Sequence, residues 1–260
     1  MLPDNKKTMM YTRLVRRLRM LKLPDFRAYI ERVEKEIRRG GQEELLFMVN
    51  AMTTNVTSFF RENHHFEHLA KNLGALCDKF GQVCIWSSAC STGQEPWSIA
   101  MVVAEHLAAK PQDKIKIIAT DIDSSVLTVA QKGEYLLKAD DVKANPRLRK
   151  WLKVGREADD NILQQSVFHV DERLKGLVSF AQMNLLKPWT LREKTCHVVF
   201  CRNVIIYFSK DTQRGLFVNM ERQMPAGGLL YLGHSESLLG VSTAYETKGQ
   251  TIYIKKDISA

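Results

Sequence analysis

The chain has 260 residues, of which 45% are apolar, and a formal net charge of +9. This length and composition predict a globular protein with one large domain or two small ones, and they exclude a disordered chain. We expect a cytoplasmic protein, because there is no apolar run of about 18 residues and no charged-then-apolar signal pattern at the N-terminus. The five cysteines include no CxxC pair, so neither zinc nor a disulfide is expected.

The first part of the chain is predicted to form a small all-helical domain. Apolar residues recur at helical intervals from Met9 to Leu76, and breaks at 23–24, 40–41 and 53–57 divide this stretch into four short helices. Residues 1–40 carry twelve Lys and Arg against five acids, a local charge of +7. Such a surface favours an acidic partner, either nucleic acid or an acidic protein helix, and a merely solvated helix face is the alternative.

After Gly81 the pattern changes to strands that alternate with helices. Strands are expected at 83–86, 115–119, 178–180, 197–201, 229–232 and 251–254, and helices at 96–107, 125–131 and 211–224. This alternation predicts an α/β fold with a doubly wound, mostly parallel sheet. We therefore assign residues 1–76 to the helical domain and its linker, and residues 77–260 to the sheet domain. Residues 136–177 break the rhythm and are expected to form an inserted antiparallel β subdomain.

The turn between the first expected strand and the first expected helix of the sheet domain is highly informative. Residues 86–96 read WSSACSTGQEP, so small side chains let a ligand approach the backbone, and Glu95 adds a carboxylate where Pro96 starts the helix. A pyrophosphate prefers bare amide donors at a helix N-terminus, whereas a carboxylate suits a cation. The turn therefore favours S-adenosylmethionine, with its ammonium and sulfonium charges, and predicts a methyltransferase.

Polar residues also follow the ends of the next two expected strands, where ligands bind in doubly wound sheets. Asp121 stands where an acid commonly receives ribose hydroxyls, and a helix N-cap by Asp121 or Asp123 is the alternative. Asn184 and Leu185 follow the third strand within MNLLKPW and are placed to meet an adenine. An ordinary turn would explain these last two residues equally well.

The fourth strand end lies in the stretch HVVFCRNVIIYF. Arg202 and Asn203 stand there between apolar runs, and such polar side chains are costly to bury unless they bind something. Tyr207 places a hydroxyl nearby. A structural Arg/Asn pair that caps the sheet is the alternative.

Upstream of the sheet, the stretch TTNVTSFFRENHHF places Asn55, Thr57 and Arg61 in the linker beside paired aromatic residues. His64 and His65 follow within the same stretch. Adjacent residues on a helix point in different directions, so we expect these histidines to be structural and no metal to be bound.

Six stretches together resemble the chemotaxis receptor methyltransferases (CheR family), which methylate glutamate side chains of chemoreceptors with S-adenosylmethionine. They span residues 53–236 and read, in order, TTNVTSFFRENHHF, WSSACSTGQEPWSIAM, IIATDID, MNLLKPW, FCRNVIIYF and GGLLYLGHSE. The resemblance implies Arg61 and Tyr207 as the catalytic residues nearest the transferred methyl group. It implies cofactor contacts for Asn55, Thr57, Arg61, Glu95, Asp121, Asn184, Leu185, Arg202 and Asn203.

The resemblance also implies a receptor partner. The basic N-terminal helices match the receptor-facing helices of the family, and the acidic methylation helices of bacterial chemoreceptors would complement them. Gln94 departs from the family, which often has a second acid there, but Glu95 keeps the charge. In this family the inserted subdomain can bind a receptor tether peptide through a glycine-containing loop, but the corresponding segment here is poor in glycine and carries acids, so tether binding is not expected. The insertion has two glycines, Gly155 and Gly176, and carries the acids Glu157, Asp159 and Asp160.

Two other functions stay open from the sequence. A nucleic-acid methyltransferase would fit the positive charge, but amino methylation of bases commonly uses a D/N-P-P-Y/F strand end, whereas Val-Ile-Ile separates Asn203 from Tyr207. A non-catalytic adaptor that senses S-adenosylmethionine would not need both Arg61 and Tyr207. The expected protein is a protein-glutamate O-methyltransferase that forms glutamyl methyl esters and S-adenosylhomocysteine. We expect a monomer with no nucleic-acid partner and no membrane insertion.

Overall fold

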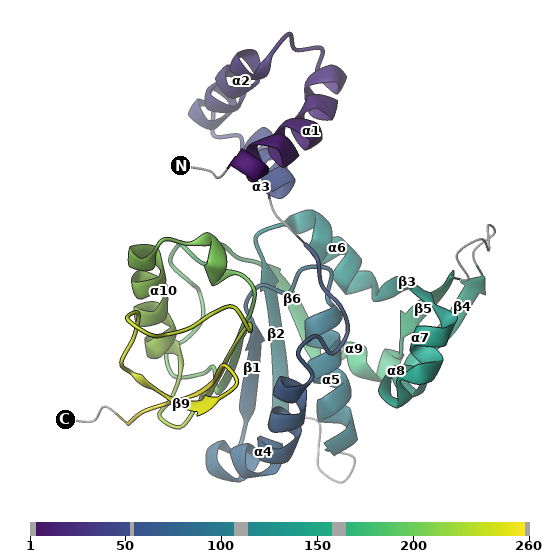
Figure 1. The fold of residues 1–260 in the computed structure, drawn as a ribbon, viewed down its shortest axis with the longest axis vertical. Coiled ribbons are helices and arrows are strands. Elements are labelled where there is room, and N and C mark those ends of the chain that lie inside the picture. The colour runs from purple at the N-terminus through teal and green to yellow at the C-terminus, as the bar shows by residue number, and fades with distance from the viewer. Residues whose placement is uncertain (1–3, 53–54, 107–113, 158–164, 258–260) are drawn as a thin grey trace. The chain divides into compact units, whose positions relative to one another are not determined.

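The computed structural model describes residues 4–52, 55–106, 114–157 and 165–257 (Figure 1). Contacts within the chain divide it into two compact units. The first unit comprises the chain up to Asn55 together with Asp123–Ser125, and the second comprises Val56–Ile122 and Val126–Ala260.

The first unit is built from three helices, α1 (Asp4–Met20), α2 (Phe26–Arg38) and α3 (Glu43–Met52). Its core consists of Leu14 and Leu18 from α1 with Tyr29 and Val33 from α2. The helices stop where the sequence predicted breaks, and Asp25 begins α2 by accepting a hydrogen bond from the backbone N–H of Ala28 at 2.8 Å. The apolar residues that recur at helical spacing in these helices therefore form a small core, as predicted.

The second unit contains a seven-stranded sheet in the order β6-β2-β1-β7-β8-β10-β9. The first five strands in this order are parallel, which confirms the predicted doubly wound α/β fold. Strand β9 was not expected, because only its first residue is buried. The strands are β1 (Val83–Ser87), β2 (Ile115–Asp121), β6 (Val178–Gln182), β7 (Val198–Cys201), β8 (Leu229–Leu232), β9 (Tyr245–Gly249) and β10 (Ile252–Lys255).

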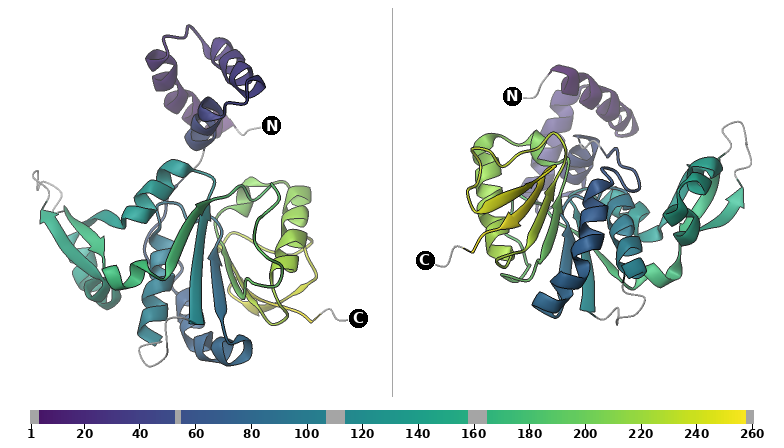
Figure 2. Two further views of the ribbon diagram at one scale, coloured as in Figure 1. Left: turned by 180° about the vertical axis from the view of Figure 1, so that it is seen from behind. Right: turned by 60° about the horizontal axis from the view of Figure 1, so that its bottom comes forward.

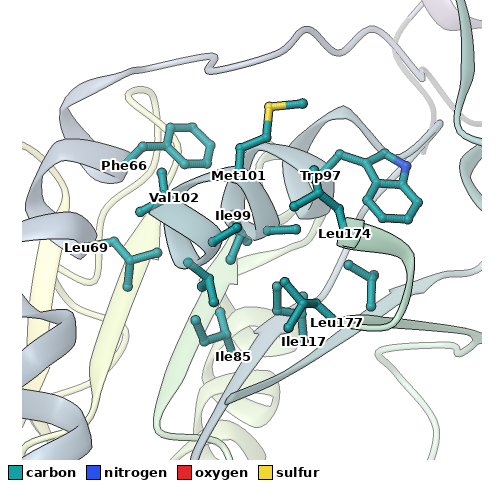
Figure 3. Close-up of a cluster of buried hydrophobic side chains, with 14 of the residues drawn as sticks. Phe66, Leu69, Ile85, Trp97, Ile99, Met101, Val102, Ile117, Leu174 and Leu177 are labelled. Carbon is teal, nitrogen blue, oxygen red and sulfur yellow. The ribbon is translucent and has the colours of Figure 1, made fainter. Parts of the chain in front are cut away.

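Helices cover both faces of this sheet, with α10 on one side and α4 and α5 on the other (Figures 1 and 2). The helices are α4 (His64–Phe80), α5 (Gln94–His106), α6 (Ser124–Lys132) and α10 (Lys210–Gln223). Neighbouring strand residues alternate between the two layers: Ile85 belongs to the α4/α5 layer (Figure 3), and Trp86 packs with Phe217 of α10. Burial on both faces explains why the parallel strands read as continuous apolar runs.

Helix α4 belongs to the second unit, and this differs from the domain boundary that the sequence placed at residue 76. Phe66, Leu69 and Leu73 of α4 are fully buried in the core of the sheet layer. Helical periodicity predicted the helix correctly, but it carries no information about which core the apolar face joins. The division at residue 55 therefore replaces the one at residue 76.

The insertion forms a separate antiparallel sheet in the order β3-β5-β4, as predicted. Its strands are β3 (Glu134–Lys138), β4 (Leu152–Glu157) and β5 (Gln165–Val170). It also holds three short helices that were not expected, α7 (Ala139–Ala144), α8 (Pro146–Trp151) and α9 (Glu172–Lys175). Asn145 separates the first two, because its side chain caps α8 through the backbone N–H of Arg147 at 3.0 Å. Asp159 and Asp160 lie outside the described residues.

Gly93 of the turn before α5 cannot carry a side chain without strain. Its φ is +97°, and a Cβ there would lie 2.8 Å from both the Cβ of Ala130 and the hydroxyl of Tyr135. We expect Gly93→Ala to lower the free energy of unfolding by about 2–4 kcal/mol in urea denaturation. The matched control is Gly74→Ala in α4, where a Cβ meets nothing within 4 Å, and we expect it to stabilise by about 0.5–1 kcal/mol. Equal effects of the two changes would contradict this account.

Candidate functional site

The carboxyl ends of β6, β2, β1 and β7 meet at one edge of the sheet, and the loops that follow them are tied together through the backbone. The N–H of Ser88 donates to the carbonyl of Phe200, and the N–H of Cys90 donates to that of Thr120, both at 2.9 Å. The N–H of Met183 donates to the carbonyl of Asp121, also at 2.9 Å. The strand ends that the sequence predicted as a ligand site are therefore neighbours at this edge.

Arg202 lies at the centre of a buried ion cluster at this edge. It is 5% exposed, and its Nη1 lies 2.9 Å from Oε2 of Glu95 while its Nη2 lies 3.2 Å from Oε2 of Glu62. Nη2 also donates to the backbone carbonyl of Arg61, and the guanidinium lies over the ring of Phe66. Arg202 thus joins the linker to the first turn of the sheet, and its predicted contact with the cofactor stays a prediction.

The pKa values of the two carboxylates around Arg202 are shifted in opposite directions. Burial raises the pKa of Glu95, although the charge of Arg202 and the hydroxyl of Ser87, 2.7 Å from Oε1, act against it. Burial also favours the neutral form of Glu62, but hydrogen bonds from His234 and the charge of Arg202 outweigh it and lower the pKa of Glu62 to about 2. With both carboxylates ionised the cluster has a net charge of −1, which suits a cationic ligand.

Asp121 at the end of β2 supports the backbone of the first turn. It is 8% exposed, and its Oδ2 accepts a hydrogen bond from the N–H of Ser91 at 2.8 Å. The capping contact that was the alternative for this region belongs to Asp123, whose Oδ1 accepts from the N–H of Ser125 at 2.9 Å. Asn55 lies in the first unit, where its amide donates to Oδ2 of Asp123 at 2.9 Å. The predicted cofactor contacts of Asp121 and Asn55 stay predictions.

Asn184 and Leu185 adopt the ordinary turn that was the alternative for this stretch. Oδ1 of Asn184 accepts a hydrogen bond from the N–H of Leu186 at 2.9 Å, and Leu185 is 7% exposed in the α10 layer of the core. This turn follows β6 beside Asp121, so both residues lie at the predicted edge. Contacts to an adenine are not excluded by the turn and stay a prediction.

Arg61 and Tyr207, the predicted catalytic pair, are both accessible. Arg61 is half-buried, and its Nη1 donates to the carbonyl of Val56 at 3.0 Å. In contrast to Arg202, Arg61 forms no ion pair with any carboxylate in the described part of the chain. Tyr207 is 46% exposed at the end of η3 (Ile205–Tyr207), and Thr57 is half-buried in the linker.

Three residues that contact the loops of this site were not predicted from the sequence: Glu62, His234 and Glu236. Oε1 of Glu62 lies 3.0 Å from Nδ1 of His234, and Glu236 is 4% exposed and binds the loop after β7. Glu62 follows Arg61 directly, and the other two lie in the stretch GGLLYLGHSE, which was recognised as a whole without roles for its residues. An acid beside a predicted ligand residue is the only signal that pointed to Glu62.

His65 is expected to make the stability of the fold depend on pH. It is fully buried, and its Nε2 lies 3.1 Å from both the carbonyl of Gln250 and Oγ1 of Thr251. Burial, with the nearby charge of Arg202, lowers the pKa of His65 to about 3, whereas the unfolded side chain takes up its proton near pH 6.5.

The folded state therefore binds fewer protons than the unfolded state between pH 6.5 and 3, and stability falls as the pH falls through this range. We expect the free energy of unfolding to be less dependent on pH in His65→Gln than in the wild type. Urea denaturation at pH 8, 6, 5 and 4 measures this dependence. An equal loss between pH 6.5 and 4 in both proteins would contradict the role of His65.

The described ranges offer neither a cluster of metal ligands nor a helix that could cross a membrane. No group of three or more His, Cys, Asp or Glu side chains there is arranged to hold a metal ion. No helix among the residues that the structure describes has the length and apolar character needed to span a bilayer.

Comparisons with known proteins agree with the predicted family over nearly the whole chain. The family model of the CheR methyltransferase SAM binding domain matches residues 55–254, and that of the CheR all-alpha domain matches residues 1–53. A probable chemotaxis protein methyltransferase of Rhizobium etli is 37% identical over 97% of this chain and 92% of its own length.

The chemotaxis protein methyltransferase of Salmonella typhimurium is 36% identical over 98% of this chain and 85% of its own length. Chemotaxis protein methyltransferase 2 of Pseudomonas aeruginosa is 38% identical over 97% and 86%, respectively. These matches confirm the predicted family, methyltransferase activity and cofactor. The chain therefore belongs to the CheR family of chemotaxis methyltransferases, which use S-adenosylmethionine.

Proposed function

We propose that this chain methylates glutamate side chains on the cytoplasmic helices of chemoreceptors and so forms glutamyl methyl esters. The proposal rests on a difference in ion pairing between two neighbouring arginines. The side chain of Arg202 donates to the backbone carbonyl of Arg61. Arg202 is buried between two carboxylates, whereas Arg61 has no carboxylate partner among the described residues. Arg61 is therefore available to an incoming substrate carboxylate.

The residues at the sheet edge fit S-adenosylmethionine. The residues that follow β1 up to Gly93 all have small side chains, so they leave room for a ligand near the backbone of this turn. With Glu62 and Glu95 both ionised, their cluster with Arg202 has a net charge of −1, which complements a sulfonium and an ammonium. We propose that Asn55, Thr57, Asp121, Asn184, Leu185 and Asn203 also contact the cofactor, together with Arg61, Glu95 and Arg202.

Transfer to a carboxylate needs positioning more than proton transfer. S-adenosylmethionine supplies a methyl group bonded to a sulfonium, and a glutamate is already ionised near pH 7 because its ordinary pKa is about 4.3. Arg61 orients the carboxylate by one oxygen, and the hydroxyl of Tyr207 steers the other toward the methyl carbon. A tighter ion pair with Arg61 would stabilise the ground state and raise the barrier.

The exposed basic residues of the first unit support an acidic helical partner. Arg17 is not part of this surface, since its Nε lies 3.1 Å from Oε2 of Glu44. We propose that the surface binds the acidic methylation helices of the receptor, and such binding should weaken with salt. The exposed members are Arg13, Arg16, Arg19, Lys22, Arg27, Arg32, Lys35, Arg38 and Arg39.

A methylation assay separates this proposal from its two rivals. The full chain is incubated with methyl-labelled S-adenosylmethionine and either receptor signalling fragments or DNA, and the products are then treated with base. We expect base-labile label on a receptor fragment, because methyl esters hydrolyse in base. Label on DNA would favour the nucleic-acid methyltransferase, and cofactor binding without label on any substrate would favour the adaptor.

A further inference from the structure

We propose that Glu236 is a positioning residue for methyl transfer, whose buried carboxylate holds the segment 203–207 in its working conformation. This inference rests on the proposed function, because that function gives Asn203 and Tyr207 their roles. Glu236 acts through the backbone of this segment, and no role in touching substrate or cofactor is assigned to it.

The carboxylate of Glu236 accepts hydrogen bonds from four backbone N–H groups. Its Oε2 lies 2.6 Å from the nitrogen of Gly233 and 2.8 Å from that of Asn203. Its Oε1 lies 2.9 Å from the nitrogens of both Val204 and Ile205. Successive N–H groups that converge in this way form a concave anion site, and here a side chain of the chain itself occupies it.

The segment that Glu236 holds has a backbone conformation that needs support. Asn203 follows β7 and Arg202 with a φ of +58°, in the left-handed region that non-glycine residues rarely adopt. The opposing wall is Gly233, where a Cβ would lie 2.9 Å from the nitrogen of Asn203 and 2.9 Å from Oε2 of Glu236. The loops after β7 and β8 therefore fit together only with glycine on one side and the carboxylate between them.

The contact between Glu236 and the backbone of residues 203–205 also determines the position of Tyr207. Ile205 carries the last amide that Glu236 binds and is also the first residue of η3, and it is 1% exposed. Its carbonyl accepts a hydrogen bond from Nε2 of Gln213 at 2.9 Å, so the segment is fixed on the α10 side as well. Tyr207 follows two residues later, and its backbone N–H donates to the carbonyl of Val204 at 3.3 Å, within the segment that Glu236 holds. Its position follows from the anchored backbone before it.

The test is Glu236→Gln in the full chain. A glutamine has the same shape but replaces one oxygen with an NH₂ group, so two backbone donors face another donor and lose their acceptor. We expect turnover with a receptor fragment to fall at least about tenfold. We also expect faster amide hydrogen exchange at 203–205 and 233. The matched control is Glu221→Gln in α10, whose carboxylate accepts from Oγ of Ser242 at 2.7 Å away from this segment.

Glu236→Asp is a second test of the same hydrogen bonds. It keeps the charge but is one methylene shorter, so we expect an intermediate fall in turnover, and it carries the test if Glu236→Gln does not fold. Wild-type turnover in a folded Glu236→Gln, or faster exchange at 203–205 with unchanged turnover, would overturn the proposal. If the wild type itself methylates no receptor fragment, the proposed function fails, whereas the exchange result still reports on the contact.

Discussion

Arg202→Met is expected to lower the free energy of unfolding by about 3–5 kcal/mol, because it leaves two buried carboxylates without their shared cation. Both Glu62 and Glu95 lie within 3.2 Å of the guanidinium, whose side chain is 2% exposed. Urea denaturation at pH 7 measures the loss. The control is Arg214→Met, which breaks an exposed pair with Asp211 and should cost about 0–1 kcal/mol.

A triple variant distinguishes lost charge compensation from lost packing. Arg202→Met combined with Glu62→Gln and Glu95→Gln removes all three charges, so most of the lost stability should return. Cofactor binding should stay impaired in the triple variant, because the two carboxylates beside Arg202 that would face the cationic donor are gone. If Arg202→Met alone lowers the free energy of unfolding by no more than Arg214→Met does, the ion cluster does not stabilise the contact between the linker and the sheet.

Tyr207→Phe is expected to lower kcat by about 10- to 100-fold, with little change in the affinity for S-adenosylhomocysteine. The substitution removes one hydroxyl from a side chain that is 46% exposed, so little packing is lost. Arg61→Ala should lower kcat by at least as much, since it removes the cation that orients the substrate carboxylate. Steady-state kinetics with a receptor fragment and calorimetry with the product separate the two effects.

The matched control for Tyr207→Phe is Tyr253→Phe. Tyr253 is 9% exposed on β10, outside the loops that form the candidate site, and the same hydroxyl deletion there should leave kcat unchanged. Unchanged kcat in Tyr207→Phe would remove its proposed role in steering the nucleophile.

The order of strands and helices could be read from the sequence because burial on both faces of a parallel sheet imposes long apolar runs. Strand β9 was not predicted, because four of its five residues are exposed and the sequence YETKG therefore shows no apolar pattern. Helix α4 was predicted but assigned to the wrong core, because periodicity identifies a buried face and not its partner. The short helices of the insertion are too brief for a periodic signal.

The candidate site was predicted in outline because the carboxyl ends of neighbouring parallel strands must meet. Arg202 stood out as a polar residue between apolar runs, but its partners could not be deduced, since Glu95 is 107 residues away in the chain. Glu236 was missed for a different reason: its four donors are backbone amides, which leave no trace in the sequence.

Calorimetric titration of the full chain with S-adenosylhomocysteine tests the central claim, that the carboxyl edge of the sheet holds a cationic methyl donor beside Arg61 and Tyr207. We expect one binding site in the wild type and at least about tenfold weaker binding in Asp121→Asn, which alters the acid at the end of β2. Absence of binding in the wild type, or equal affinity in both proteins, would contradict the account.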